Sequence, residues 1–353
     1  MQKNILVTGA SGFIGSFLVE EAVRQNYRTF AGIRTASSKK YLSDPHIHFF
    51  ELDFGNKKLL DASLNNFANQ YGRFDYIIHT AGLTKAINKA NYSLVNYENT
   101  KTFVHALKEN DLVPDKFVYI SSIASFGPGI NGLPIYSDQA QQPLTEYGKS
   151  KLMAEKFLYG DPDFPFLIIN PTVVYGPRDK DFLFLLRSIE KHLEVYLRSA
   201  RQLLSFIHVH DLVRAIFLAM ESPALHQNLL VSDLNRYTSK LFNNTLKKAL
   251  GKKTISLILP GYVAGLFAII AEIAGRIRGE ATVLSRERLK DFKAMNWSVD
   301  CANIIKLGFV PQFSLEEGLN HTIRWYKEQG WIKGNDRVPL ERKTNDMNLD
   351  HFM

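Results

Sequence analysis

Short, continuous apolar runs alternate with amphipathic segments along the first half of the chain. The amphipathic segments, such as residues 15–25 and 99–110, have the periodicity of helices. Strands that alternate with helices are typical of parallel βαβ units, and continuous apolar runs indicate a sheet that is covered on both faces. We therefore predict an α/β fold with a doubly wound parallel sheet. The apolar runs that predict its strands are residues 4–9, 28–34, 46–54, 74–82, 116–122 and 165–171.

The alternation ends near residue 175, where helical patterns begin to dominate. We predict that residues 1–174 form the sheet domain and that strand-like segments near 204–233 return to it. Residues 175–330 are predicted to form a smaller, mostly helical portion. The polar end of the chain, residues 333–353, lacks periodicity and is predicted to be a flexible tail.

One segment, residues 256–271, carries no charge and is flanked by lysines and arginines. It is shorter than the roughly 20 residues of a membrane-spanning helix, and Pro260 with Gly261 interrupts it. We expect a helix that packs against the protein or lines a groove. Peripheral contact with a membrane through 256–271 stays open as the alternative.

Composition and charge exclude few classes of protein. The 353 residues are 45% hydrophobic and 22% charged, which is ordinary for a globular protein. The formal charge of +8 is spread along the chain, so we expect a solvated basic surface and no nucleic-acid partner. Cys301 is the single cysteine, which excludes an intramolecular disulfide and fits a reducing, cytoplasmic compartment. The chain begins directly in a predicted strand without the layout of a signal peptide, and its ten histidines show no metal-binding spacing, so no metal is expected.

Three glycines, Gly9, Gly12 and Gly15, lie between the first predicted strand and the first predicted helix. In a Rossmann-type domain such glycines allow a tight turn, let the backbone approach a pyrophosphate and let the helix pack on the strand. The start of the helix offers free N–H groups to the phosphates. This context predicts an NAD(P)-binding loop. The loop residues expected to contact the cofactor are Gly9, Ser11, Gly12, Phe13, Ile14 and Gly15.

The end of the second predicted strand indicates which dinucleotide binds. An acid there would bond the ribose hydroxyls of NAD, whereas an arginine accommodates the 2′-phosphate of NADP. This chain has Arg34 at that place and no acid along the following loop until Asp44. NADP(H) is therefore favoured, and NAD(H) is the alternative.

Tyr147 and Lys151 are four residues apart, just ahead of a helix-forming run, in the stretch TEYGKSK. That spacing places a phenol and an ammonium on one helical face. A free tyrosine ionises near pH ~10, and a nearby cation favours the phenolate. Together with a cationic nicotinamide ring, Lys151 is expected to bring the pKa of Tyr147 towards neutrality.

Eight short motifs follow one another along the chain. They are TGASGFIG, LDF, HTAG, VNYENT, YISSIASFG, YGKSK, NPTVVYGP and FIHVHDL. With these motifs the chain resembles the extended short-chain dehydrogenase/reductases, also called the NAD-dependent epimerase/dehydratase family, over roughly residues 3–330. The resemblance implies hydride transfer between nicotinamide and a carbinol or carbonyl carbon of a small-molecule substrate. We also expect a homodimer.

The resemblance assigns roles to individual residues. Tyr147 matches the catalytic acid/base, Lys151 the residue that holds the ribose and tunes the phenol, and Ser122 the hydroxyl that bonds the substrate oxygen. Further positions match cofactor contacts of the family: Leu52 and Asp53 at adenine, Ala81 and Gly82 near pyrophosphate and ribose, Asn96 beside the central helix, and Pro171, Thr172 and Val173 past the nicotinamide.

The resemblance also separates the reactions of the family. Sugar-nucleotide 4,6-dehydratases carry Asp-Glu directly after the catalytic hydroxyl, where this chain has Ile123 and Ala124, so a dehydratase is not expected. Many epimerases carry an Arg-Asp pair that grips the substrate diphosphate, where this chain has Leu204 and Ser205. A second arginine is expected in the loop before the stretch WSVD, where this chain has only Lys293. Arg178, Arg198 and Arg201 are the possible substitutes, and Lys85, just past the cofactor loop, is a further candidate for substrate contact.

The apolar segments of the second half resemble the branch that contains 3β-hydroxysteroid dehydrogenases and dihydroflavonol reductases. In that branch the substrate portion faces a lipophilic alcohol or ketone. The expected function is therefore NAD(P)-dependent oxidation or reduction of a lipophilic secondary alcohol or ketone. A nucleotide-sugar epimerase of the same family is one alternative, and a non-catalytic dinucleotide-binding sensor is another.

Overall fold

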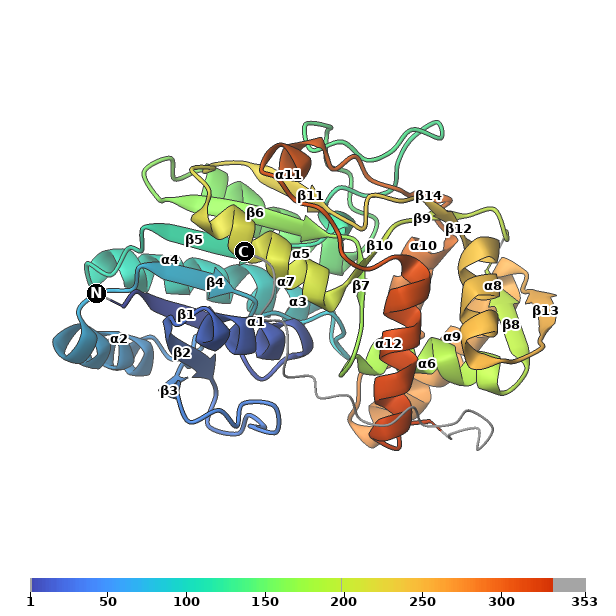
Figure 1. The fold of residues 1–353 in the computed structure, drawn as a ribbon, viewed down its shortest axis with the longest axis horizontal. Helices are drawn as coiled ribbons and strands as arrows, with labels where there is room; N and C mark the ends of the chain where they lie inside the picture. The colour runs from blue at the N-terminus through green and yellow to red at the C-terminus, as the bar shows by residue number, and fades with distance from the viewer. Residues whose placement is uncertain (1, 198, 333–353) are drawn as a thin grey trace, which may run out of the picture.

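A seven-stranded parallel sheet forms the centre of the protein (Figure 1). The computed structural model describes residues 2–197 and 199–332, so the tail predicted at 333–353 lies outside the described residues. The strands of the sheet are β1 (Asn4–Thr8), β2 (Arg28–Ile33), β3 (Ile47–Glu51), β4 (Tyr76–His79), β5 (Lys116–Ile120), β6 (Phe166–Pro171) and β11 (Asn228–Val231). They lie in the order β11-β6-β5-β4-β1-β2-β3, with all neighbours parallel, which confirms the predicted doubly wound, Rossmann-type sheet.

Helices cover both faces of this sheet, as its continuous apolar strands require. Successive side chains of β1 point into two different cores. Ile5 and Val7 belong to the core under α1 and α7, and Leu6 belongs to the core under α2, α4 and α5. The covering helices are α1 (Phe13–Arg24), α2 (Lys57–Tyr71), α4 (Asn99–Glu109), α5 (Glu146–Tyr159) and α7 (Val209–Glu221), and a short helix α3 (Ala90–Ser93) with the π-helical turn η1 (Leu94–Glu98) leads into α4.

A smaller portion lies beside the carboxyl ends of the sheet strands (Figure 1). Its apolar core is shared among α6, α8 and α12. Two short sheets, β7 with β10 and β12-β9-β14, lie between this core and the main sheet, and β13 pairs with β8. The elements are β7 (Val173–Tyr175), α6 (Lys180–Glu190), β8 (Leu193–Tyr196), β9 (Leu203–Leu204), β10 (Phe206–His208), β12 (Tyr237–Thr238), α8 (Ser239–Leu250), β13 (Ile255–Ile258), α9 (Gly261–Arg278), α10 (Arg286–Lys293), β14 (Asn296–Trp297), α11 (Ala302–Lys306) and α12 (Leu315–Glu328).

The uncharged segment 256–271 differs from the single helix expected there. Its first residues belong to β13, which pairs in parallel with β8, and the helix begins only after Pro260, which cannot continue a helix from its own N-terminal side. From Gly261 the helix α9 runs to Arg278, well past the predicted end. No helix among the described residues is long and apolar enough to cross a membrane.

Candidate active site

The loop between β1 and α1 holds the predicted glycines in close contact with its neighbours. Gly9 has φ of +66°, and a Cβ there would lie 2.8 Å from the backbone nitrogen of Ala81. A Cβ on Gly15 would lie 2.2 Å from the carbonyl oxygen of Gly9. Gly12 caps α1 without a side-chain hydrogen bond, which leaves N–H groups of the first turn available to an anion. The loop and the first helical turn also contain Ser11, Phe13 and Ile14.

Arg34 directly follows β2, and its side chain is exposed. The loop bends back there, since the N–H of Ser37 donates to the Arg34 carbonyl oxygen at 2.9 Å and the N–H of Arg34 donates to Ser37 Oγ at 3.1 Å. Glu51, at the end of β3, accepts a hydrogen bond from the Thr35 hydroxyl. An acid therefore lies beside the predicted phosphate-binding arginine. The sequence analysis missed Glu51 because it searched β2 and its loop, whereas Glu51 comes from the neighbouring strand.

Leu52 and Asp53 follow β3. Leu52 is buried, and its Cδ1 atom lies 2.9 Å from where Gly32 would carry a Cβ. Asp53 is exposed and accepts a hydrogen bond from the Gly55 N–H at 3.0 Å. The two residues thus lie beside the edge strand of the sheet, where we predict that the adenine binds.

Asn96 joins the loop after β4 to the helix α5. Its side-chain oxygen accepts from the Leu83 N–H at 2.7 Å, and its Nδ2 donates to the Leu83 carbonyl oxygen at 3.0 Å and to Ser150 Oγ at 2.9 Å. A Cβ on Gly82 would lie 2.9 Å from Asn96 Oδ1. Asn96 lies in the π-helical turn η1, an irregularity that is frequent at functional sites.

The segment from Pro171 to Val173 links β6 to β7. Pro171 and Thr172 are buried, and Val173 is exposed. The Thr172 hydroxyl has no hydrogen-bond partner among the described residues. A buried hydroxyl of this kind is normally satisfied by a protein group, water or a ligand. With the uncapped start of α1, it fits a dinucleotide lying across the ends of the strands.

Tyr147 and Ser122 meet at the end of β5. Thr145 caps α5 through its side chain, which places Tyr147 in the first turn of that helix, and Ser122 caps a 3-10 turn, η2 (Ile123–Ser125). The ring centroids of Tyr147 and Tyr92 are 6.1 Å apart. Burial raises the pKa of Tyr147 above 10.0, whereas its hydrogen bond with Ser122 and the nearby Arg288 act to lower it.

Lys151 lies one helical turn after Tyr147 and is buried. Its Nζ donates to the carbonyl oxygen of Ile120 at 2.8 Å and lies 4.8 Å from the centroid of the Tyr119 ring. Burial lowers the pKa of Lys151 to about 8. Burial thus dominates the Tyr147 pKa in the protein without cofactor, whereas the expected shift towards neutrality includes a bound nicotinamide ring and stays a prediction.

Glu155, one turn further along α5, is a buried carboxylate that the sequence analysis missed. Ser121 donates to its Oε1, as does Asn170 Nδ2 at 2.8 Å. Gln141 and Asn228 donate to its Oε2 at 2.6 and 3.1 Å. The charge is thus satisfied by four donors from separate segments, which ties α5 to β5, β6 and β11. Glu155 lies four residues after Lys151 on the same face of α5, and this spacing is the signal in the sequence that could have identified it.

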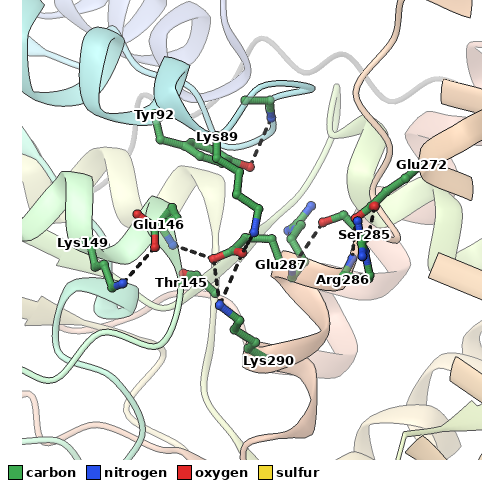
Figure 2. Close-up of polar contacts among 12 residues, drawn as sticks. Lys89, Tyr92, Thr145, Glu146, Lys149, Glu272, Ser285, Arg286, Glu287 and Lys290 are labelled. Carbon is green, nitrogen blue, oxygen red and sulfur yellow. Dashed lines mark hydrogen bonds and ion pairs between the residues drawn. The ribbon is translucent and has the colours of Figure 1, made fainter. Parts of the chain in front are cut away.

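Helix α10 closes over the start of α5 (Figure 2). Glu287 Oε1 accepts from the Glu146 N–H at 2.6 Å, and Lys89 Nζ lies 2.7 Å from Glu287 Oε2. Thr145 Oγ1 donates to Asp291 at 3.3 Å. Burial raises the pKa of Asp291 to about 7. The carboxylates of α10 therefore lie at the positive end of the helix that carries Tyr147.

Lys85, predicted as a substrate contact, belongs to an ion-pair group at the edge of the site. Its Nζ lies 2.5 Å from Asp181 Oδ1, and Arg288 Nη1 lies 3.1 Å from Asp181 Oδ2. Arg288 also lies near Tyr147, and the sequence analysis did not single it out. The expected position of a second arginine is the loop before the WSVD stretch, whereas Arg288 comes from α10, one turn after its N-cap Ser285.

Arg178, the second predicted substrate contact, binds α1. Its guanidinium donates to Ser16 Oγ at 3.0 Å and to Glu20 Oε1 at 2.6 Å. It also lies over the rings of Phe17 and Tyr41, at 4.1 and 4.5 Å from their centroids. These contacts hold the loop after β7 against α1, and the substrate role of Arg178 stays a prediction.

A pocket of about 460 Å³ opens beside Tyr92. Charged side chains from two parts of the chain line it: Lys89, Glu272, Arg276, Glu280, Arg286 and Glu287. Within residues 2–197 and 199–332, no group of three or more His, Cys, Asp or Glu side chains is placed to hold a metal ion.

Comparison with known proteins gives a family match over residues 5–230, to the NAD dependent epimerase/dehydratase family. The UDP-glucose 4-epimerase of Vibrio cholerae is 28% identical over 350 residues, covering 96% of this chain and 98% of that protein. The ceramide reductase of Caulobacter vibrioides is 23% identical over 334 residues, covering 94% and 96%. The decarboxylating sterol-4-alpha-carboxylate 3-dehydrogenase of Dictyostelium discoideum is 22% identical over 332 residues, covering 90% and 99%.

Solved structures share the fold. The UDP-glucose 4-epimerase of Thermotoga maritima, solved with UDP-glucose, has a TM-score of 0.74 at 19% identity and covers 92% of this chain and 99% of its own. The UDP-glucuronic acid 4-epimerase of Bacillus cereus, solved with NAD, has a TM-score of 0.72 at 20% identity, with coverage of 92% and 99%. At these identities the likeness shows the fold alone.

Proposed function

Because the chain belongs to the NAD-dependent epimerase/dehydratase family, we propose that it is an NAD(P)-dependent oxidoreductase that interconverts a lipophilic secondary alcohol and its ketone. The observation that carries this proposal is the position of Tyr147. The phenol lies in the first turn of α5 and interacts with Ser122, and Lys151 follows one helical turn later. The glycine loop leads into α1, whose first turn has no side-chain cap.

Each residue of the triad has a distinct task in this proposal. The bound nicotinamide supplies or accepts the hydride. Ser122 holds the substrate oxygen by a hydrogen bond, and Tyr147 gives that oxygen a proton during reduction or takes it during oxidation. Lys151 holds the ribose hydroxyls of the cofactor and favours the phenolate.

A lipophilic substrate is supported by what the chain lacks at the expected diphosphate positions. Ser205 is buried and donates to the Asn235 carbonyl oxygen at 3.0 Å, and Leu204 packs against the apolar cores. Lys293 donates to the carbonyl oxygen of Gly261 at 3.3 Å. The similarity to a ceramide reductase and a sterol dehydrogenase supports the same substrate class.

Nucleotide-sugar epimerisation is the second candidate, and a specific observation favours it. Arg288 and Lys85 share the carboxylate of Asp181 at the edge of the site, so a substrate phosphate that displaced Asp181 would meet two cations. The similarity to the UDP-glucose 4-epimerase of Vibrio cholerae supports this candidate as well.

Turnover by the purified protein tests both candidates. NADPH or NADH oxidation is followed with steroid, flavonoid and aliphatic ketones, and conversion of UDP- and GDP-sugars is followed in parallel. We expect ketone reduction by the wild type and its loss in Tyr147→Phe. Conversion of a sugar nucleotide without reduction of any ketone would replace the first proposal by the second. Binding of NADPH without turnover of either class would favour a non-catalytic sensor.

A further inference from the structure

Helix α9 has the reverse of the pattern expected for a helix on a globular protein. Its buried residues are small, namely Ala264, Ala268 and Gly275. A surface helix normally buries its large apolar side chains and exposes polar ones. In α9 the large apolar side chains are the exposed ones, and each has an exposed fraction of 38% or more: Tyr262, Leu266, Phe267, Ile269, Ile270, Ile273 and Ile277.

The strand β13 extends this apolar surface. Ile255, Leu257 and Ile258 are 68%, 41% and 64% exposed, and only Leu259 and Pro260 separate the strand from α9. β13 pairs with β8, at the end of the molecule remote from β2 and β3 (Figure 1). We refer to the exposed apolar side chains of β13 and α9 together as the α9 face. Exposed large apolar side chains gathered on two consecutive elements indicate an interaction site.

Cations lie around the α9 face. Lys252 and Lys253 precede β13, Lys293 Nζ lies 3.3 Å from the carbonyl oxygen of Gly261 at the start of α9, and Arg276 and Arg278 end the helix. None of these five forms an ion pair with another residue within 2–197 and 199–332. Exposed Glu280 also follows Arg278, so the charges that flank the α9 face are mostly but not all positive. Apolar side chains flanked mainly by unpaired cations are complementary to a bilayer surface that carries anionic lipids.

We propose that the α9 face docks the protein on an anionic lipid bilayer, with the apolar side chains in the interface and the cations at the headgroups. A second copy of the chain is a poorer partner. In a two-fold contact the same surface meets itself, so the flanking cations of both copies would lie close together. A bilayer offers the opposite charge instead.

Docking at this face has a consequence for the active site. Glu272 and Arg276 of α9 line the pocket beside Tyr92, whose ring lies next to that of Tyr147. The pocket would therefore open close to the membrane surface. This last step rests on the proposed lipophilic substrate, whereas the docking itself does not and is measured without substrate or cofactor.

Flotation of the purified full-length protein with lipid vesicles tests the proposal. The vesicles are phosphatidylcholine alone, or phosphatidylcholine with phosphatidylglycerol at a molar ratio of about 3 to 1. The apolar test variant is Leu266→Ser with Phe267→Ser, two side chains that are 59% and 52% exposed. The matched control is Leu59→Ser with Val310→Ser, which are 56% and 66% exposed and lie on α2 and in the loop before α12.

We expect the wild type and the control to float with the anionic vesicles, and the apolar variant to bind on the order of tenfold or more weakly. Lys252→Gln with Lys253→Gln should weaken binding to anionic vesicles several-fold, as added salt should. Thermal unfolding checks that each variant is folded.

Three results would overturn the proposal. The first is no flotation of the wild type with either vesicle. The second is flotation that the apolar variant and the control share equally. The third is a wild-type dimer that ignores vesicles and becomes monomeric in the apolar variant, as measured by light scattering, which would assign the α9 face to a second copy.

Discussion

The contact between α10 and α5, the helix that carries Tyr147, can be tested by replacing a carboxylate with an amide. Glu287→Gln keeps an oxygen that can accept from the Glu146 N–H and removes the negative charge. In the wild type that oxygen lies 2.6 Å from the nitrogen, and the Glu287 side chain is 5% exposed. The variant therefore measures what the charge contributes at the start of α5.

The magnitude follows from three contacts of Glu287: the Glu146 N–H, Lys89, and the half-exposed Lys290, whose Nζ lies 3.4 Å from Glu287 Oε2 and adds little. A hydrogen bond to a charged group contributes about 1.5–3 kcal/mol, against about 1 kcal/mol for a neutral one. The ion pair with Lys89 adds less than about 1 kcal/mol, because the Lys89 side chain is 61% exposed. We expect Glu287→Gln to lower the free energy of unfolding by about 1–2 kcal/mol. With an unfolding entropy of about 2.1 cal/mol/K per residue, Tm should fall by roughly 2 °C.

The effect should depend on pH in a definite direction. Burial raises the pKa of Glu287, but the hydrogen bonds from Lys89 and from the Glu146 N–H outweigh it and hold the pKa below 4.5. A depressed carboxyl pKa stabilises the folded state above the unfolded value, and this stabilisation is lost as pH falls through the folded pKa. The Tm difference between wild type and variant should therefore be full at pH ~7 and shrink below pH ~4.5.

Thermal unfolding monitored by circular dichroism at several pH values is the assay. Glu316→Gln is the matched control, since its ion pair with Lys248 joins two exposed side chains, at 52% and 73%, and should contribute almost nothing. Equal Tm changes in the two variants, or a Glu287→Gln effect that stays constant down to pH ~4, would refute the assignment of this charge to the helix start.

Three further outcomes follow from the candidate site. Tyr147→Phe should lower kcat about 10²–10⁴-fold, while NADPH binding still quenches the protein fluorescence. Ser122→Ala should lower kcat less, because Tyr147 can still transfer the proton. Arg34→Ala should remove a preference for NADPH over NADH in fluorescence titrations and leave NADH affinity nearly unchanged; equal affinities in the wild type would contradict the NADP assignment. Because burial lowers the pKa of Lys151 to about 8, NADPH affinity should fall as pH rises through that value, and Lys151→Met should abolish this dependence.

The sheet could be predicted from the sequence because its signal is local. The strands from β1 to β6 lie in short runs rich in apolar residues, although β3 also carries His48 and Glu51, and Gly9 with its two partner glycines lies between the first strand and the first helix. Tyr147 and Lys151 could be found for the same reason, since four residues separate them. Local spacing is enough where one element carries the whole feature.

The remaining site could not be predicted because its contacts join distant segments. Glu287 lies 141 residues from Glu146, and Asn228 lies 73 residues from Glu155. No periodicity links such residues. The strand β13 was missed for a different reason, since its four residues merge in the sequence with the apolar start of α9.

The position of β11 bears on how the chain folds during synthesis. β6 pairs with β5 on one side and with β11 on the other, and β11 begins only at Asn228. Until β11 has emerged, β6 presents an unpaired edge with an apolar sequence, and such edges promote aggregation. At about 5–20 residues per second, translation leaves that edge open for roughly 3–12 s. A fragment that ends at residue 174 would keep it open permanently, so we expect that fragment to aggregate and the nascent chain to need a chaperone over this interval.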